Sequence, residues 1–435
     1  MRRRAYLKAV GAGSIAGLAG CSGNGGEGGS DGGGGNGGSD GGGGSDGGGG
    51  GDGGSDGGAE TGTTTGSTGG DSPYVLGALE PQGFAPFKPW ADAHIRGLRI
   101  GVDELNQGDM LDREVELKIV DSQADPAKAD SGFRRLVENE DAVAITGPVS
   151  SDVGIRTAQT AAELEVPNLL HMAGSSQILS KDTRHTFRVG WLPSRTHARA
   201  DADYIAQNDV GSMGAVVADY AWGRSIESAL EEFVPDDVDL HIEVAPLGAD
   251  DFTPFLRRIP DDVELMNFVG HPSGSITAVQ NMFGLGMDQP VLGVDPPQAA
   301  LINILGEAVT NDVITRHLAV PGTEGYNALG QKVADRFDMP MYAYEPISYM
   351  TTQMFGQAVA EVGADPTGIA DFIRNGSFDM LYESPLEYTE WGEFESPVLL
   401  YSRIVEGSPS YYPDADYDLE VVAKTDELPV PEPDA

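Results

Sequence analysis

Small polar residues follow a short apolar run in the first half of the sequence, in a pattern that can bind an anion. Residues 147–151 read Gly-Pro-Val-Ser-Ser, directly after the apolar run 143–146 and just before a helical pattern. The free N–H groups at a helix N-terminus, together with the hydroxyls of Ser150 and Ser151, can hold a carboxylate. A plain helix cap is the alternative, because Ser is also a preferred capping residue.

Other candidate binding residues also stand where a short apolar run ends. They are Ala173 and Ser175 after residues 168–171, Trp222 after residues 215–218, and Asp295 after residues 291–294. In open parallel sheets, ligands bind beyond the carboxyl ends of the strands, so these positions are expected to face one crevice. Trp222 would offer an aromatic wall there, although core packing explains a Trp at this point equally well.

Signatures of covalent catalysis and of metal binding do not occur in the sequence. It contains no Gly-x-Ser-x-Gly, Walker or His-Glu-x-x-His motif, and its seven His residues show no pair at metal-ligand spacing. The single Cys excludes an intrachain disulfide. We therefore expect a binding protein rather than an enzyme, with no cofactor and no metal site.

The net charge of the chain limits the classes of molecule that it can bind. Among 435 residues, 68 Asp and Glu stand against 27 Lys and Arg, for a net charge of −41. Such a field repels phosphate, so nucleic acid is excluded as a partner. The acidic residues are spread along the chain, which is typical of a solvated surface adapted to high salt.

The N-terminus predicts export and a lipid anchor. Arg2, Arg3 and Arg4 precede a weakly apolar stretch at 9–19, and small residues lead to Cys21. This pattern resembles a twin-arginine signal peptide over residues 1–20 that ends in a lipobox, with Cys21 as the lipidated residue. Residues 21–72 are rich in Gly, Ser, Asp and Thr, and this composition predicts a disordered tether.

From residue 73 onward, short apolar runs alternate with amphipathic helical patterns. Strands are expected at 74–79, 115–120, 143–146, 215–218, 241–244, 265–269 and 291–294, with helices between them. This alternation predicts an α/β fold made of βαβ units with parallel sheets. Because one sheet rarely takes up so many units, we expect two lobes.

The order of these segments resembles the type I periplasmic binding proteins, in the Leu/Ile/Val-binding branch of the substrate-binding proteins of ABC importers. The pieces that carry the resemblance are residues 77–81, 97–106, 121–126, 145–148 with Ser151, 219–223 and 284–286. They follow the family's order, and the resemblance as a whole covers about residues 73–410. The resemblance implies two Rossmann-like lobes, joined by a three-segment hinge near Pro193, Ala319 and Glu390. The N-terminal lobe would comprise 73–193 and 319–390, and the C-terminal lobe 194–318 and 391–425.

The resemblance also implies roles for individual residues. Ser151 would bind the carboxylate of the ligand, and Ala173 with Ser175 (or Gly174) would complete that site. Asp295 would meet the ligand's ammonium group. Trp222 stands where relatives have an aromatic residue before Gly, and His271 falls in a further ligand-facing loop.

The implied function is that of a lipid-anchored extracytoplasmic receptor for an ABC importer. It would be a monomer that captures a small amino acid, of branched-chain type, and delivers it to ABC permease subunits. A sensing subunit of the same fold remains an alternative. So does a receptor for amides, urea or other carboxylates, because Phe84, Phe87 and Trp90 replace the usual small residues after Pro81.

Overall fold

The structure is a computed structural model that describes residues 72–430, except 294–301, 304–305 and 307–312. The predicted signal peptide, the tether, Cys21 and Asp295 lie outside the described residues. Within the described part of the chain, no helix combines the length and the apolar character that crossing a membrane requires.

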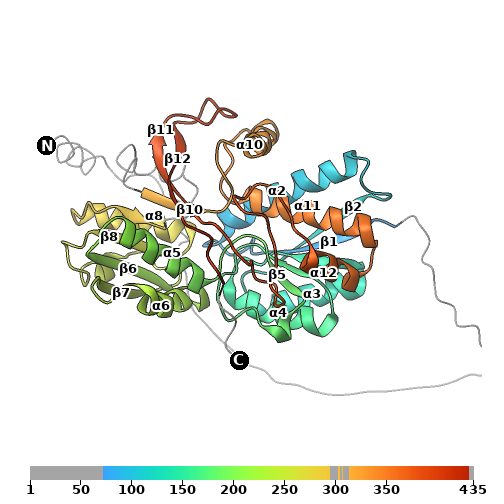
Figure 1. The fold of residues 1–435 in the computed structure, drawn as a ribbon, viewed down its shortest axis with the longest axis horizontal. Helices are drawn as coiled ribbons and strands as arrows, with labels where there is room; N and C mark the ends of the chain where they lie inside the picture. The colour runs from blue at the N-terminus through green and yellow to red at the C-terminus, as the bar shows by residue number, and fades with distance from the viewer. Residues whose placement is uncertain (1–71, 294–301, 304–305, 307–312, 431–435) are drawn as a thin grey trace, which may run out of the picture. The chain divides into compact units, whose positions relative to one another are not determined.

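The first sheet has five parallel strands in the order β2-β1-β3-β4-β5 (Figure 1). They are β1 (Tyr74–Glu80), β2 (Val115–Asp121), β3 (Ala142–Thr146), β4 (Asn168–Leu170) and β5 (Thr186–Arg188). The crossover helices are α2 (Lys88–Gln107), α3 (Pro126–Glu140) and α4 (Ser151–Leu164), and a short 3-10 helix, η1 (Lys181–Thr183), precedes β5.

Strand β1 is buried on both faces, as the centre of a doubly covered sheet must be. Leu76 and Ala78 pack in one hydrophobic cluster with Leu98 of α2. Val75 and Leu79 pack in another cluster, with Phe133 and Leu136 of α3. Successive side chains of a strand point to opposite faces, so the continuous apolar run of β1 holds both helix layers to the sheet.

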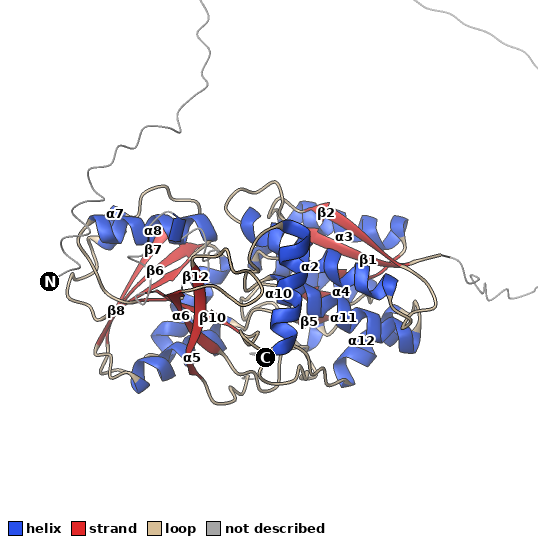
Figure 2. Ribbon diagram, turned by 90° about the horizontal axis from the view of Figure 1, so that it is seen from above, coloured by secondary structure: helices blue, strands red, loops and turns tan. Residues whose placement is uncertain are grey.

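The second sheet has seven strands in the order β12-β11-β10-β9-β8-β6-β7. Its strands are β6 (Ser212–Asp219), β7 (Asp239–Pro246), β8 (Leu265–Val269), β9 (Val291–Leu292), β10 (Val313–His317), β11 (Leu400–Glu406) and β12 (Tyr417–Lys424). Its helices are α5 (Ser194–Gln207), α6 (Ala221–Phe233), α7 (Thr253–Leu256) and α8 (Pro272–Gly284). Figure 2 shows α7 and α8 on one side of the strands, with α5 and α6 on the other.

After β10 the chain returns to the first sheet through α10 (Glu324–Phe337), α11 (Glu345–Val362) and α12 (Pro366–Asn375). Helix α11 packs along α2. The contact is close because α2 carries glycines there: a Cβ at Gly101 would lie 1.7 Å from Thr352 Oγ1. Strand β11 then brings the chain back into the second sheet, beside β10.

The prediction of an α/β fold with two parallel-sheet lobes is confirmed, with one difference. Strands β11 and β12 pair antiparallel with each other, and β11 pairs antiparallel with β10. The loop between β11 and β12 spans only residues 407–416. A parallel crossover needs a dozen or more residues, so a hairpin is the arrangement that this loop permits. The lobe boundaries and hinge positions implied by the resemblance stay predictions.

Candidate functional site

A small cavity lies where the carboxyl ends of strands from both sheets face each other. Its volume is about 20 Å³. The lining residues are Trp90, Val149, Met172, Trp191, Tyr220, Trp222, Val269, Gly270, Ser275 and Arg316. Half of them stand just beyond a strand: Val149 after β3, Met172 after β4, Trp191 after β5, Tyr220 after β6 and Gly270 after β8. This is the edge at which parallel sheets bind ligands.

Aromatic rings form much of the cavity wall. Trp90 and Trp191 come from the first sheet's side, and Tyr220 and Trp222 come from the second sheet's side. The rings of Trp191 and Trp222 meet edge to face, with centroids 6.4 Å apart. Each of the three Trp side chains is nearly buried. The cavity therefore offers flat apolar surfaces of the kind that hold the carbon skeleton of a solute.

Around this cavity, the elements that surround the first sheet contact those that surround the second; we call these two groups of elements the two sides. The rings of Phe87 and Tyr220 lie 5.8 Å apart. The amide of Ala221 donates to Asp152 Oδ2 at 3.4 Å, and the amide of Ser176 donates to Ser194 Oγ at 3.3 Å. Because these contacts cross from one sheet's elements to the other's, a solute held in the cavity would touch both sides.

Arg316 supplies positive charge to the lining. It projects from β10, and its Nη1 donates to Asp201 Oδ2 at 2.6 Å. Asp201 is fully buried on α5 and also accepts from Asn267 Nδ2 at 3.1 Å. Burial raises the pKa of Asp201, and the neighbouring Arg316 opposes that rise. Among the described lining residues, Arg316 is the one that carries a charge.

Ser151 joins the start of α4 to residues 173–175. Its Oγ accepts hydrogen bonds from the amides of Gly174 and Ser175, both at 3.1 Å. Ser151, Ala173 and Ser175 are all buried, and none of them lines the cavity. In this arrangement, the two amides that would suit a ligand carboxylate are bonded to Ser151 instead.

Arg188 also binds the loop of residues 173–175. Its guanidinium donates to the carbonyl oxygens of Ala173 and Ser175 and pairs with Glu393, with Nη2 to Oε1 at 2.6 Å. Both charged side chains are buried. The predicted loop is therefore held by a buried ion pair that links β5 to residue 393.

The remaining predicted residues occupy different positions. Trp222 lines the cavity, and its ring lies against Gly174. His271 caps α8, with its Nδ1 accepting from the Gly274 amide at 3.1 Å. Burial lowers the pKa of His271 to about 4. It stands next to Gly270, which lines the cavity, and its ring faces that of Phe87 at 6.5 Å. Asp295 is outside the described residues.

Sequence reasoning missed Met172, Trp191 and Arg316 as lining residues. Met172 and Trp191 follow strands, so the rule that selected Ser151 would also have found them. Arg316 lies within β10 and pairs with Asp201, 115 residues away, so no local signal marks it. The sequence marks Trp90 only as a departure from the usual pattern of relatives.

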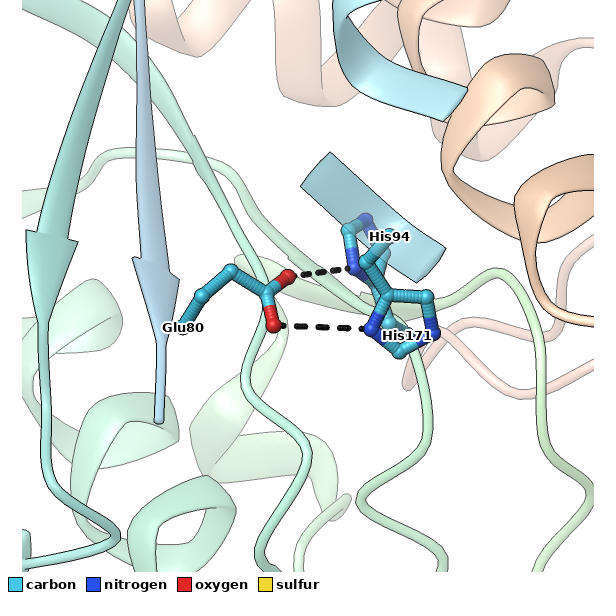
Figure 3. A group of neighbouring side chains, drawn as sticks. All are labelled: Glu80, His94 and His171. Carbon is cyan, nitrogen blue, oxygen red and sulfur yellow. Dashed lines mark hydrogen bonds and ion pairs between the residues drawn. The ribbon is translucent and has the colours of Figure 1, made fainter. Parts of the chain in front are cut away.

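Sequence spacing also missed a cluster of possible metal ligands. Glu80, His94 and His171 are fully buried, and their ligand atoms lie within 4.8 Å of one another (Figure 3). The expectation of no metal site rested on the absence of closely spaced His pairs. The fold assembles this group from the end of β1, the first half of α2 and the residue after β4.

Comparisons with known proteins place this geometry in a family. The family profile described as periplasmic binding protein matches residues 73–402. The Leu/Ile/Val-binding protein homolog 6 of Brucella melitensis is 27% identical over 247 residues, which are 54% of this chain. The chain spans about 60% of the length of that curated relative.

Solved structures share the fold at low identity. A leucine-binding protein of Thermotoga maritima superposes with a TM-score of 0.70 at 16% identity, covering 81% of this chain and 99% of that one. The branched-chain amino acid binding protein of Streptococcus pneumoniae, in complex with isoleucine, gives 0.69 at 14% identity, covering 80% and 100%. A solute-binding protein of Rhodopseudomonas palustris, in complex with 3,4-dihydroxybenzoic acid, gives 0.70 at 17% identity, covering 82% and 98%.

These relatives are named as binding proteins rather than enzymes, in agreement with the expectation from the sequence. The predicted resemblance to type I proteins of the Leu/Ile/Val-binding branch is confirmed by the family match and by these neighbours. With a family profile that covers residues 73–402, a two-sheet fold and a cavity between the strand ends, the chain belongs to the periplasmic binding protein family.

Proposed function

We propose that this protein is the solute-binding lipoprotein of an ABC importer. It captures a small amino acid between its two sides and is held at the extracytoplasmic face of the membrane by a lipid on Cys21. The family match supports a solute receptor. The lipid anchor rests on the sequence around Cys21, which is outside the described residues.

The lining of the cavity is the observation that carries the proposal. Trp90, Trp191 and Trp222 offer flat apolar surfaces, and Arg316 offers a guanidinium. This combination suits a solute with an apolar body and a carboxylate, since guanidinium groups pair with carboxylates in a planar, two-point geometry. A branched-chain amino acid has both parts.

Capture requires the two sides to separate and close again. A cavity of about 20 Å³ is far smaller than the few hundred cubic ångströms that a small-molecule site occupies. A solute that touches both sides would stabilise the closed arrangement by its greater affinity for that form. The importer would then recognise the closed form, so no covalent step is needed.

An aromatic acid is a second candidate solute, and the ring content of the lining favours it. Four of the ten lining residues are Trp or Tyr. A neighbouring solved structure holds 3,4-dihydroxybenzoic acid. Such a ligand has no ammonium group and would not need Asp295, whereas an amino acid would.

A thermal-shift screen of the full chain in high salt tests the proposal. The panel contains leucine, isoleucine, valine, phenylalanine, benzoate, urea and short amides, with isoamylamine as leucine without its carboxylate. We expect leucine or one of its branched-chain relatives to raise the melting temperature and isoamylamine to leave it unchanged. A shift from benzoate alone would favour the second candidate, and a panel without any shift would contradict both.

A pair of variants connects the solute to the cavity. Trp222→Leu removes a lining ring, so the affinity for the best solute should fall roughly 10- to 100-fold. Phe133→Leu is the control, because Phe133 is a buried ring in the cluster between β1 and α3. That variant should lose stability and keep its affinity. Equal affinity losses in both variants would contradict the assignment of the cavity.

Neighbouring genes separate import from sensing: permease and ATPase genes favour import, and a chemoreceptor gene favours sensing.

A further inference from the structure

We propose that Glu80, His94 and His171 form a binding site for a divalent transition-metal ion, with zinc as the best match. The site lies next to Trp90 and Met172, which line the solute cavity on the first sheet's side. It does not depend on the identity of the solute.

The distances fit one ion. His171 Nδ1 lies 3.0 Å from Glu80 Oε1, and His94 Nδ1 lies 3.5 Å from Glu80 Oε2. Tetrahedral zinc with bonds of about 2.0–2.2 Å to nitrogen and oxygen separates its ligand atoms by about 3.3 Å. Figure 3 shows both imidazole rings turned toward the carboxylate of Glu80. Three protein ligands would leave the fourth position for a water molecule.

The hydrogen bonds of His171 fix its tautomer in the form that a metal needs. The hydroxyl of Thr146 donates to the carbonyl oxygen of Leu169 at 3.2 Å, so its oxygen accepts from His171 Nε2–H. The lone pair of His171 therefore sits on Nδ1, facing Glu80. Metal-bound histidines typically donate their other N–H to a neighbouring oxygen in this way.

Three buried atoms of the cluster lack a hydrogen-bond partner, and an ion would supply one for two of them. Within the described part of the chain, neither ring nitrogen of His94 has a hydrogen-bond partner, and the same holds for Glu80 Oε2. All three residues are fully buried, where an unsatisfied polar group is costly. An ion bound to His94 Nδ1 and to the carboxylate of Glu80 would remove that cost at His94 Nδ1 and at Glu80 Oε2.

Without an ion, one proton must occupy the space between Glu80 Oε1 and His171 Nδ1. The lone pair of His171 Nδ1 faces Glu80 Oε1 at 3.0 Å, so the two atoms share that proton. A divalent ion would replace this proton and release it to solvent, as metal binding to protonated ligands generally does.

The charges around the cluster tolerate a cation. Arg96, two residues after His94, is paired with Glu345, with Nη2 to Oε1 at 2.7 Å. Asp92 also lies near enough to raise the pKa of Glu80 by repulsion. Asp92 is itself paired with Lys88 at 2.7 Å, so the nearby charges are already balanced and the ion would meet the carboxyl group of Glu80.

The position of the cluster connects it to the cavity. Trp90 and His94 are four residues apart on α2 and so share a helix face, and both rings contact that of Tyr344. Met172, which lines the cavity, directly follows His171. An ion bound here would tie β1, α2 and the residues after β4 together next to the cavity.

Metal analysis of the full chain tests the site. Because the cluster is fully buried, the protein is refolded from denaturant with zinc chloride, and parallel samples receive magnesium chloride. Washing with high salt and excess Mg²⁺ strips ions from the acidic surface, whose oxygen ligands do not favour zinc. We expect about one zinc ion retained per chain in the samples that received zinc and no zinc in those that received only magnesium. A washed wild-type protein without zinc would overturn the proposal.

Variants identify the ligands. The double variant His94→Gln, His171→Gln should retain at least tenfold less zinc than the wild-type chain. His241→Gln is the matched control, because His241 lies 3.2 Å from Asp239 at the partly exposed strand β7 and imitates a surface site. Equal retention by the double variant and the wild type would overturn the assignment.

X-ray absorption of the zinc-loaded wild-type protein covers the case in which the double variant does not fold. The expected signature is a low-coordinate shell with two imidazole groups and oxygen. A shell made only of oxygen atoms would show surface binding and would overturn the proposal without any variant.

Discussion

The indole ring of Trp222 lies directly on Gly174, which leaves no room for a side chain at that position. A Cβ on Gly174 would lie 2.4 Å from Trp222 Cζ3 and 2.9 Å from Trp191 Cδ1. Gly174 belongs to the loop that Ser151 and Arg188 hold on the first sheet's side, whereas Trp222 stands on α6 of the second. The contact is therefore part of the closure between the two sides.

A Gly174→Ala variant should bind its solute more weakly while remaining folded. The added methyl group can be accommodated if the two sides move apart, so the closed form loses free energy relative to an open one. We expect at least a tenfold loss of affinity in calorimetric titration with the best solute from the screen. Gly284→Ala is the control, since a Cβ there meets no atom within 4 Å. Unchanged affinity in Gly174→Ala would show that closure does not depend on this contact.

Breaking the ion pair between Arg188 and Glu393 should cost more stability than breaking a surface pair. Arg188→Met leaves the buried carboxylate of Glu393 without its partner, which typically costs about 3–5 kcal/mol in free energy of unfolding. Adding Glu393→Leu should recover part of that loss, because the unpaired charge is then gone. The measurement is urea denaturation of the single and double variants.

The partly exposed pair of Arg134 and Glu163 provides the comparison. Arg134→Met should cost about 1 kcal/mol or less, as exposed pairs do. If Arg188→Met cost no more than Arg134→Met, the ion pair would not support the loop as the geometry indicates.

Asp295 decides between the two candidate solutes. If it pairs with an ammonium group, as the resemblance implies, Asp295→Ala should lower the affinity for an amino acid by roughly 30- to several-thousand-fold, the cost of about 2–5 kcal/mol for a lost partner in a desolvated pair. The affinity for an aromatic acid should not change. Calorimetric titration with leucine and with benzoate checks this. An amino-acid affinity within threefold of the wild type would contradict the predicted role.

Cys21→Ser should release the protein from the membrane. Lipid chains contribute about 0.8 kcal/mol for each buried CH₂ group, so a diacylated Cys would hold the chain firmly. The variant should appear in the medium or remain unprocessed when cells are fractionated and the protein is detected by immunoblot. A variant that is cleaved and sediments with membranes like the wild type would refute the lipobox prediction.

The elements of the fold were more predictable than the pairs that form the site. The expected strand at 74–79 is β1, because its apolar run is buried on both faces. The strand-end rule placed Ser151 and Ser175 beyond the carboxyl ends of β3 and β4, where the structure has them, and their role in binding stays a prediction. It could not show that the Ser151 hydroxyl binds the loop amides, which depends on the path of the chain after β4.

Buried polar partners are the part that sequence alone did not reveal. Asp201 and Arg316 are 115 residues apart, and Glu80 and His171 are 91 residues apart. In the sequence, each of these residues looks like an ordinary charged or polar residue at the protein surface. Their pairing depends on which strand ends become neighbours, and that information lies in the sheet order rather than in local spacing.

Acidification should destabilise the protein in part through His317, which joins β10 to β11. Its Nδ1–H donates to the carbonyl oxygen of Ala319 at 2.8 Å, so its Nε2 accepts from the hydroxyl of Ser402 at 2.7 Å. Burial lowers the pKa of His317 to about 4. In the unfolded chain an ordinary His takes up its proton near pH 6.5. Between these two values the unfolded state binds more protons, so the free energy of unfolding falls as the pH falls.

The full effect of this one residue is about 3 kcal/mol, since each pKa unit corresponds to about 1.4 kcal/mol. Other buried groups titrate in the same range, so the wild-type curve must be compared with variants. His317→Gln should be less stable at pH 7, but its stability should fall less steeply between pH 6.5 and pH 4, as measured by urea denaturation at a series of pH values. Ser402→Ala retains the buried imidazole and should keep most of the wild-type slope. Parallel curves for His317→Gln and the wild-type protein would show that His317 already takes up its proton in the folded state near pH 6.5.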